Sequence, residues 1–221
     1  MVALLDERRV HATFFCTHSG VQVTGHERAL HPNFRRTGNT TTDAAAAPIL
    51  DDRAFYRSIV SATREFCPEA VGVRSHSLFT DSDLLPIYRD AGLEYDSSYM
   101  LPLAPGLAPV LRGSGILEIP AFYMDHWDLN ESATSLTIQD LHLERPGLKV
   151  TIFHPNLIFL NAGTKSEIES SKSHYHDPEW LLTHRNPGRG VRTLFIELLD
   201  EIARGAAPNP VMSDVNSAWR A

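Results

Sequence analysis

Short runs of β-branched and aromatic residues alternate along the chain with longer amphipathic runs, and this pattern predicts alternating strands and helices. The predicted strands are residues 10–16, 28–31, 70–73, 93–96, 116–119, 149–153 and 211–212. The predicted helices are residues 2–9, 51–66, 82–91 and 193–203. Alternation of this kind is typical of a parallel α/β sheet or barrel.

Three polar segments predict loops: residues 37–48, 102–109 and 161–187. The last is long and carries histidines, so it predicts a lid over a site. None of the three separates segments with independent cores, and we expect one domain over residues 1–221. Residues 2–9 predict the end of a helix that runs into the strand at residue 10. A strand normally precedes such a helix in an α/β protein, so we expect one strand to be missing.

Composition narrows the class of protein. The 221 residues are 43% hydrophobic and 21% charged, which is an ordinary balance for a globular domain. A net charge of −7 argues against a nucleic-acid-binding domain. The longest apolar stretch, 150–160, is interrupted by His154 and Pro155, so it predicts no membrane span, and the N-terminus lacks the apolar core of an export signal. We therefore expect a soluble, cytoplasmic protein.

Histidine is the one abundant residue type with special chemistry, at 11 copies against 20 of lysine plus arginine. The tripeptide His-Pro-Asn occurs twice, beginning at His31 and at His154, each time after a predicted strand. In parallel α/β folds the carboxyl ends of strands carry ligands and catalytic groups. The proline stops the strand and fixes the turn, which favours two functional imidazoles. The alternative is a pair of hydrogen-bonded turn histidines without function.

Two further strand ends carry candidate chemistry. The strand at 71–73 is followed by Arg74, Ser75 and His76, where an arginine could orient a carboxylate and the histidine could act beside it; an ion pair and a helix cap are the alternatives. The run after Ile119 places Asp125 beside Trp127, as in a sugar site, and the alternative is a core tryptophan with a solvated acid.

Other motifs favour no function. His174 and His176 alternate in the polar segment 161–187, where a solvated face is favoured over a pair of metal ligands. No Gly-x-Ser-x-Gly elbow occurs, so Ser/His/Asp catalysis has no support. A glycine loop that would hold a phosphate is absent as well.

The order of these segments resembles the polysaccharide deacetylase (NodB-homology) family, and more narrowly its WbmS-like branch, which is associated with O-antigen and other surface polysaccharides. The segments that carry the resemblance are VHATFFCT, ERALHPNF, GVRSHSLF with GLEYDSSY, LEIPAFYMDHW and LKVTIFHPNLIFLN. Membership implies a distorted (β/α)7-type barrel with a divalent metal, usually zinc, at the strand ends. It also implies hydrolysis of N- or O-acetyl groups on sugars, and hence a carbohydrate substrate.

The resemblance also assigns residues. His31 matches the family's first metal histidine; the second lies four residues on, where this chain has Arg35, and His76 is expected to replace it. His154 matches the general acid, and Asp125 matches the carboxylate that tunes it. Arg74 matches the arginine of the family motif and is expected to be catalytic. The expected substrate-binding residues are Trp127, Asn156 and Asn33.

One part of the family pattern is not in this sequence. The family's first strand carries two aspartates, a metal ligand and the general base, and it would precede Met1; we expect it to be missing here. An alternative function is therefore a catalytically degenerate protein that binds sugar or metal on the same fold. A third possibility is another metal-dependent amidohydrolase or phosphoesterase. A barrel lacking one strand leaves an unpaired edge at which chains could form oligomers.

Overall fold

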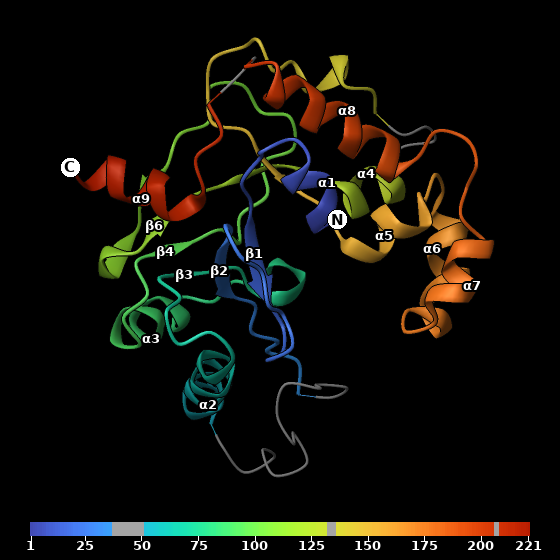
Figure 1. Cartoon of the computed structure of the whole chain (residues 1–221). Helices are drawn as coiled ribbons and strands as arrows, with labels where there is room; N and C mark the ends of the chain where they lie inside the picture. The colour runs from blue at the N-terminus through green and yellow to red at the C-terminus, as the bar shows by residue number, and fades with distance from the viewer. Residues whose placement is uncertain (37–50, 132–135, 206–207) are drawn as a thin grey trace. The chain divides into compact units, whose positions relative to one another are not determined.

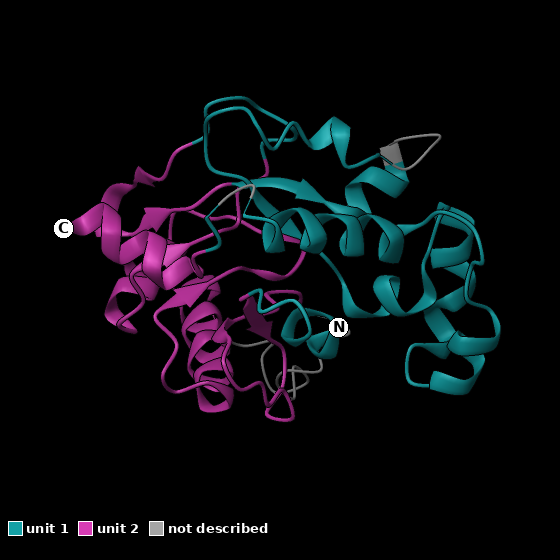
Figure 2. Ribbon diagram, turned by 45° about the horizontal axis from the view of Figure 1, so that its top comes forward, with its two compact units in different colours: residues 1–10, 101–107, 121–209 teal, residues 11–100, 108–120, 210–221 magenta. Residues whose placement is uncertain are grey.

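The computed structural model describes residues 1–36, 51–131, 136–205 and 208–221, with the side chain of Glu131 left out (Figure 1). The expected loop at 37–48 lies outside the described residues. The chain divides into two compact units, shown in different colours in Figure 2. Unit 1 comprises residues 1–10, 101–107 and 121–209, and unit 2 comprises residues 11–100, 108–120 and 210–221. Each unit is described by itself below.

Unit 2 is built on a sheet with the strand order β1-β2-β3-β4-β6-β5. Its strands are β1 (Thr13–Cys16), β2 (Glu27–Leu30), β3 (Gly72–Val73), β4 (Tyr95–Asp96), β5 (Val110–Leu111) and β6 (Leu117–Glu118). All neighbours are parallel except β5, which pairs with β6 in the antiparallel sense. The carboxyl ends of the parallel strands therefore share one edge, the edge at which β2 and β3 lead into their histidines.

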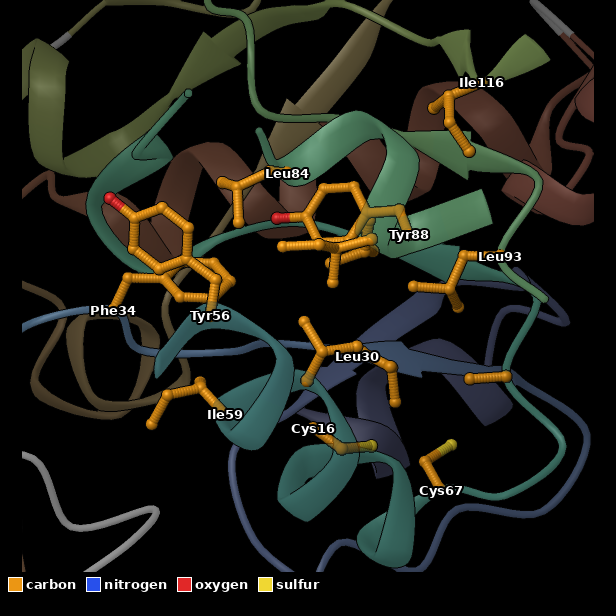
Figure 3. Packing of buried hydrophobic residues seen from close by; sticks show 14 of the residues in the cluster. Cys16, Leu30, Phe34, Tyr56, Ile59, Cys67, Leu84, Tyr88, Leu93 and Ile116 are labelled. Atoms are coloured by element: carbon orange, nitrogen blue, oxygen red, sulfur yellow. The ribbon is translucent and has the colours of Figure 1, made fainter. Parts of the chain in front are cut away.

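The helices of unit 2 pack on this sheet because their apolar residues share one face. They are α2 (Asp52–Phe66), α3 (Leu84–Asp90) and α9 (Met212–Arg220), with short 3-10 turns η2 (His76–Leu78) and η3 (Gly113–Gly115). Asp51 caps α2, since its side chain accepts a hydrogen bond from the backbone of Ala54 at 2.7 Å. Phe55 and Ile59, one turn apart, are buried in one hydrophobic cluster. Figure 3 shows Ile59 in this cluster with Cys16 and Leu30 from the strands. Burial of each such large apolar side chain contributes about 1.5–3 kcal/mol.

Gly72 is required by the packing of β3 against β4. A Cβ atom at this position would lie 1.8 Å from the ring of Tyr95, which pairs directly with Gly72 across the two strands. The Tyr95 ring is fully buried and its hydroxyl donates to Glu27 at 2.8 Å. Any larger residue at position 72 would therefore displace the tyrosine and the two strands that it joins.

The last helix, α9, is tied to the opposite end of the strands. The backbone of Met212 donates to the hydroxyl of Thr13 at 3.1 Å, and Ser213 donates to the Glu27 carboxylate at the same distance. Thr13 and Glu27 are the first residues of β1 and β2. Helix α9 thus covers the amino ends of these strands and leaves their carboxyl ends to the histidine-bearing turns.

Unit 1 contains two parallel strands and six α-helices in its described residues. The strands are β7 (Ala121–Met124) and β8 (Val150–Ile152). The helices are α1 (Val2–Asp6), α4 (Asp125–Glu131), α5 (Pro155–Leu160), α6 (Lys165–Ser171), α7 (Pro178–Thr183) and α8 (Val191–Ala203), with 3-10 turns η4 (Gln139–Leu141) and η5 (Lys172–His174). Phe122 and Tyr123 of β7 pack with Leu194 and Leu198 of α8 in the core of this unit.

Two sequence predictions are wrong at the level of elements. Residues 211–212 were expected to form a strand, but Val211 is the N-cap residue of α9, because its backbone N–H donates to the Asp214 carboxylate at 3.3 Å. The segment 161–187 was expected to be a loop, but it contains α6, η5 and α7. Thr164 and Glu167 form a capping box at the start of α6, and Asp177 caps α7. The loop expected at 102–109 is confirmed, since it forms no regular element.

The remaining elements agree in type with the prediction, and the fold is mixed α/β. The strands form a six-stranded and a two-stranded sheet within the described residues, and closure into a barrel remains a prediction. That residues 1–221 form a single domain also remains a prediction. In the described ranges, no helix combines the length and the apolar character that a bilayer crossing requires.

Candidate functional site

In unit 1, Asp125 and His154 lie together because β7 and β8 are parallel neighbours. Met124 pairs with Ile152 at the ends of the two strands, so Asp125 and His154 leave the same edge one and two residues later. Asp125 begins α4, and His154 caps α5 with Pro155 in its first turn. The proline is suited to this position since a first-turn residue has no hydrogen-bond partner for its amide. The expected convergence of these two residues is therefore present.

The Asp125 carboxylate is fully buried and accepts three hydrogen bonds. Its Oδ2 accepts from the His154 backbone at 2.7 Å, and its Oδ1 accepts from the His126 backbone at 2.7 Å and from His154 Nδ1 at 2.6 Å. A carboxylate can only accept, so the His154 ring hydrogen in this bond sits on Nδ1. The contact fixes the orientation of the ring and assigns Nδ1 to Asp125. Because the His154 side chain is 45% exposed, a bound substrate can reach it.

Sequence reasoning did not assign a role to His126, the residue between Asp125 and Trp127. Its ring centroid lies 5.9 Å from that of His154, and its Nδ1 lies 3.1 Å from the side-chain amide of Asn130. Burial, followed by the charge of His154, lowers the pKa of His126. The signal that could have found it is the spacing of four between His126 and Asn130, which places both on one face of a helix.

The two substrate-binding residues expected in unit 1 flank the Asp125–His154 pair in sequence. Trp127 is half-buried in the first turn of α4, and Asn156 is half-buried in the first turn of α5. Both therefore stand within two residues of the pair, at the same strand ends. Their assignment as sugar-binding residues remains a prediction.

In unit 2, His31 and His76 lie together at the ends of β2 and β3. Their ring centroids are 5.6 Å apart in an edge-to-face arrangement, and the backbone of His76 donates to the Pro32 carbonyl at 2.9 Å. His31 Nδ1 lies 2.7 Å from the backbone carbonyl of Arg74. A carbonyl can only accept, so the ring donates from Nδ1 and its Nε2 carries the lone pair. A backbone carbonyl holding one nitrogen while the other points to a metal is the usual setting of a histidine ligand.

The other two expected residues of unit 2 have structural partners. Arg74 is 6% exposed, donates from Nε to the Ser97 carbonyl at 2.9 Å and from Nη2 to the Ser97 hydroxyl at 2.8 Å, and stacks 4.2 Å above the Phe15 ring. Burial lowers its pKa to about 10. Asn33 accepts from the backbone of Arg35 at 3.0 Å. These contacts support the strand ends, and the catalytic and sugar-binding assignments of the two residues remain predictions.

Arg35 occupies the position at which the family resemblance places a second metal histidine. Its guanidinium donates to the Ser77 hydroxyl at 3.2 Å. A guanidinium offers only donors and stays protonated, so it cannot ligate a metal. Position 35 thus differs chemically from the histidine that the resemblance implies. Replacement of that ligand by His76, whose ring lies 5.6 Å from that of His31, remains a prediction.

Sequence reasoning missed a pair of buried acids behind Arg74. Asp96 and Glu118 are both 3% exposed, pair directly across β4 and β6, and share Arg112, whose Nη1 lies 3.4 Å and 3.0 Å from their carboxylates. Burial raises the pKa of Asp96 to about 6, and burial followed by the charge of Asp96 raises that of Glu118 to about 7. Only the register of two strands far apart in sequence reveals this pair.

A divalent metal can be tested against the donors in unit 2. Catalytic zinc sites use three protein ligands in most cases. His31 has the hydrogen bonding of a ligand and His76 lies beside it, which fits two positions of such a site. In residues 1–36, 51–131, 136–205 and 208–221, no cluster of three or more histidine, cysteine, aspartate or glutamate side chains is arranged to hold a metal. Metal binding by His31 and His76 therefore remains a prediction.

Of the two histidines expected on a solvated face, His176 is exposed and His174 is half-buried against Trp180. The Trp180 indole is stacked between His174, at 4.1 Å and 7°, and His184, at 3.8 Å and 11°. The indole packs the 3-10 turn η5 against the helix α7, so the stack holds these two elements together.

Comparisons with known proteins agree on one family. The sequence model described as WbmS-like polysaccharide deacetylase matches residues 1–172. A crystal structure from Bordetella bronchiseptica, described as a candidate polysaccharide deacetylase involved in O-antigen biosynthesis, is 24% identical with a TM-score of 0.73, covering 90% of this chain and 82% of that one. A candidate polysaccharide deacetylase from Mycobacterium smegmatis is 19% identical with a TM-score of 0.53, covering 99% of this chain and 75% of that one. Among curated proteins, no sequence matches significantly. At these identities the two structures show the fold.

Proposed function

Because this chain belongs to the WbmS-like polysaccharide deacetylase family, we propose that it hydrolyses acetyl groups of N- or O-acetylated sugars during the synthesis of surface polysaccharides. The observation that carries this proposal is the pair formed by His154 and the buried Asp125, joined at 2.6 Å. Loss of an acetyl group requires a proton for the departing nitrogen or oxygen, and a histidine oriented by a carboxylate is suited to deliver it.

The residues of unit 1 support the following chemistry. The Asp125 carboxylate favours the imidazolium form of His154 and fixes the direction of its ring. As the bond between the acetyl carbon and the sugar nitrogen or oxygen breaks, His154 Nε2 gives its proton to the departing atom. Water supplies the hydroxyl group that completes acetate. The base that accepts the proton of this water is assigned to no residue of the described chain.

The same proposal includes a divalent cation, usually zinc in this family, held in part by His31 and His76. When bound, such a cation polarises a carbonyl oxygen and lowers the pKa of a bound water. The contribution of this chain is to keep His31 in the tautomer that can ligate, through its bond to the Arg74 carbonyl at 2.7 Å.

The proposal is tested by acetate release from two probes, an N-acetylglucosamine pentamer and glucose pentaacetate. We expect the native protein loaded with zinc to release acetate from at least one probe, and His154→Ala to reduce the rate about 10²–10⁴-fold. His176→Ala, which removes an exposed histidine of the same unit, serves as the matched control and should retain the native rate. Unchanged acetate release by His154→Ala would show that His154 is not the acid.

A second candidate function is a degenerate member of the family that binds sugar or metal without turnover. Arg35 favours it, because this guanidinium replaces an expected ligand and bonds Ser77 instead. Elemental analysis and calorimetry separate the two functions. Sugar binding without any acetate release, at full zinc occupancy, is the result that would select the binding protein.

A further inference from the structure

Two imidazoles stand side by side at the carboxyl ends of β7 and β8, and different groups hold them. The ring centroids of His126 and His154 are 5.9 Å apart, with the ring planes tilted by 58°. His154 bonds the buried carboxylate of Asp125, whereas His126 bonds the side-chain amide of Asn130. His126 is exposed and His154 is 45% exposed in its side chain, so a ligand can reach both rings.

Asn130 determines which nitrogen of His126 carries the hydrogen. The amide nitrogen of Asn130 donates to the backbone carbonyl of His126 at 2.7 Å, and a carbonyl cannot bond the amide oxygen. This contact fixes the orientation of the amide, so the atom 3.1 Å from His126 Nδ1 is its nitrogen. The second amide hydrogen points to Nδ1, which must accept. In the neutral ring the hydrogen then resides on Nε2.

Desolvation and the charges around His126 together lower the pKa of this ring. Burial is the largest effect that lowers its pKa, and the charge of His154 is the second. Asp125 and Glu169 act in the opposite direction, and Lys172 lowers the pKa further. A proton on His154, favoured by Asp125, thus disfavours one on His126. In the proposed function His154 is the acid, and a lowered pKa favours His126 as a neutral hydrogen-bond donor beside it.

We propose that His126 is a substrate-binding residue of this site, whose Nε2–H, set by Asn130, donates to an oxygen of the acetylated sugar beside His154. This inference rests on the proposed deacetylase function. A neutral donor holds an oxygen atom without competing to protonate it, so delivery of the proton stays with His154. A second imidazolium at this distance would instead repel the first.

The tautomer is tested without any turnover. Long-range nitrogen–proton NMR spectra of the histidine rings, assigned with His126→Gln, should show His126 neutral at pH 7 with its hydrogen on Nε2. In Asn130→Asp the new carboxylate should accept from the ring and move the hydrogen to Nδ1. A charged His126, or one with its hydrogen on Nδ1 in the native protein, would overturn the inference.

Binding is tested in the His154→Asn background, in which acetate release does not consume the probe. We expect His126→Ala to weaken binding of the N-acetylglucosamine pentamer or glucose pentaacetate about tenfold, the loss of one hydrogen bond. His126→Gln, whose amide nitrogen stands near the place of Nε2, should retain affinity within about threefold. Circular dichroism and Tm of all variants should equal those of the background, since His126 is exposed.

The outcomes separate this inference from the proposed function. If His154→Ala abolishes acetate release but His126→Ala and the background bind the probe equally, the function stands and the inference fails. Equal weakening in His126→Ala and His126→Gln would also overturn it, because the donor would then be irrelevant. Absence of probe binding by the native protein overturns both the inference and the substrate class.

Discussion

His31 and His154 begin the same tripeptide and follow strands of parallel sheets, yet their Nδ1 atoms bond different groups. His31 donates to a backbone carbonyl, that of Arg74, whereas His154 donates to the buried carboxylate of Asp125. A neutral carbonyl adds no charge that favours the imidazolium, which suits the metal ligand proposed for His31, whereas a carboxylate favours the imidazolium, which suits the acid proposed for His154. The residue at the end of the neighbouring strand therefore sets the chemistry of each histidine.

The largest expected effect, on the rate of acetate release, comes from removing the carboxylate partner of His154 in unit 1. Asp125→Asn keeps the shape of the side chain but removes the charge that favours the imidazolium of His154. We expect kcat for acetate release to fall about 10²–10⁴-fold, because general acid catalysis is lost. Steady-state kinetics on the two acetylated probes measures it. A kcat within threefold of the native value would show that the carboxylate does not distinguish His154 from His31.

The second prediction concerns the metal and the histidine of unit 2. His31→Ala should reduce zinc affinity by more than about 100-fold, since even the loss of a group that only orients a ligand costs 10–100-fold. His154→Ala should leave that affinity within about threefold of the native value. Calorimetric titration of the metal-free protein with zinc measures both. Equal losses in the two variants would mean that the tripeptides share one role.

The third prediction compares the buried acids of the two units. Asp125 accepts three N–H bonds. Asp96 and Glu118 share the guanidinium of Arg112, and each accepts a further hydrogen bond, from the Ser98 hydroxyl and the Tyr99 backbone respectively. The raised pKa of Glu118 means that the folded state holds its proton more tightly than the unfolded chain, whose glutamate ionises near pH 4.5. Stability from this pair is therefore present below pH 4.5 and is lost as the pH rises toward about 7.

Urea denaturation between pH 4.5 and 8 tests that sign. The native free energy of unfolding should decline over the lower part of this range and level off above pH 7. Glu118→Gln should flatten the decline, since it removes one of the two coupled protons. A decline of the same slope in Glu118→Gln would place its origin in other groups. Glu197→Gln, on the exposed pair with Arg189 in unit 1, is the matched control.

Sequence patterns identified the strand ends and the residues that follow them directly. The repeated tripeptide located His31 and His154, each directly after a predicted strand. The run after the predicted strand 116–119 located Asp125, although β7 within that run was not predicted. Residues that pair across neighbouring strands could not be predicted from these patterns. Asp96 and Glu118 face each other only through the register of β4 and β6, which are separated by residues 97–116.

The sequence prediction also missed helices that lack a regular apolar face. Helix α4 begins with Asp125, His126 and Trp127, so no apolar period marks it, and the contact between His126 and Asn130 could not be anticipated. The helices α6 and α7 do carry start signals, the capping box at Thr164 and the Asp-Pro step at Asp177. The segment was nevertheless predicted as a loop, because it is polar and shows no hydrophobic period, and this period is a stronger helix signal than a cap.

The smallest effect concerns the prolines that the two tripeptides share. Pro32→Ala and Pro155→Ala should each lower the free energy of unfolding by about 0.4–1 kcal/mol, because alanine gives the unfolded chain more conformational freedom at either position. The backbone carbonyl of Pro32 that accepts from His76 is kept in the variant. Urea denaturation measures the stability, and zinc affinity and kcat should stay within about threefold. A tenfold loss of kcat in Pro155→Ala at unchanged stability would show that the proline, together with Asp125, holds the ring of His154 in place.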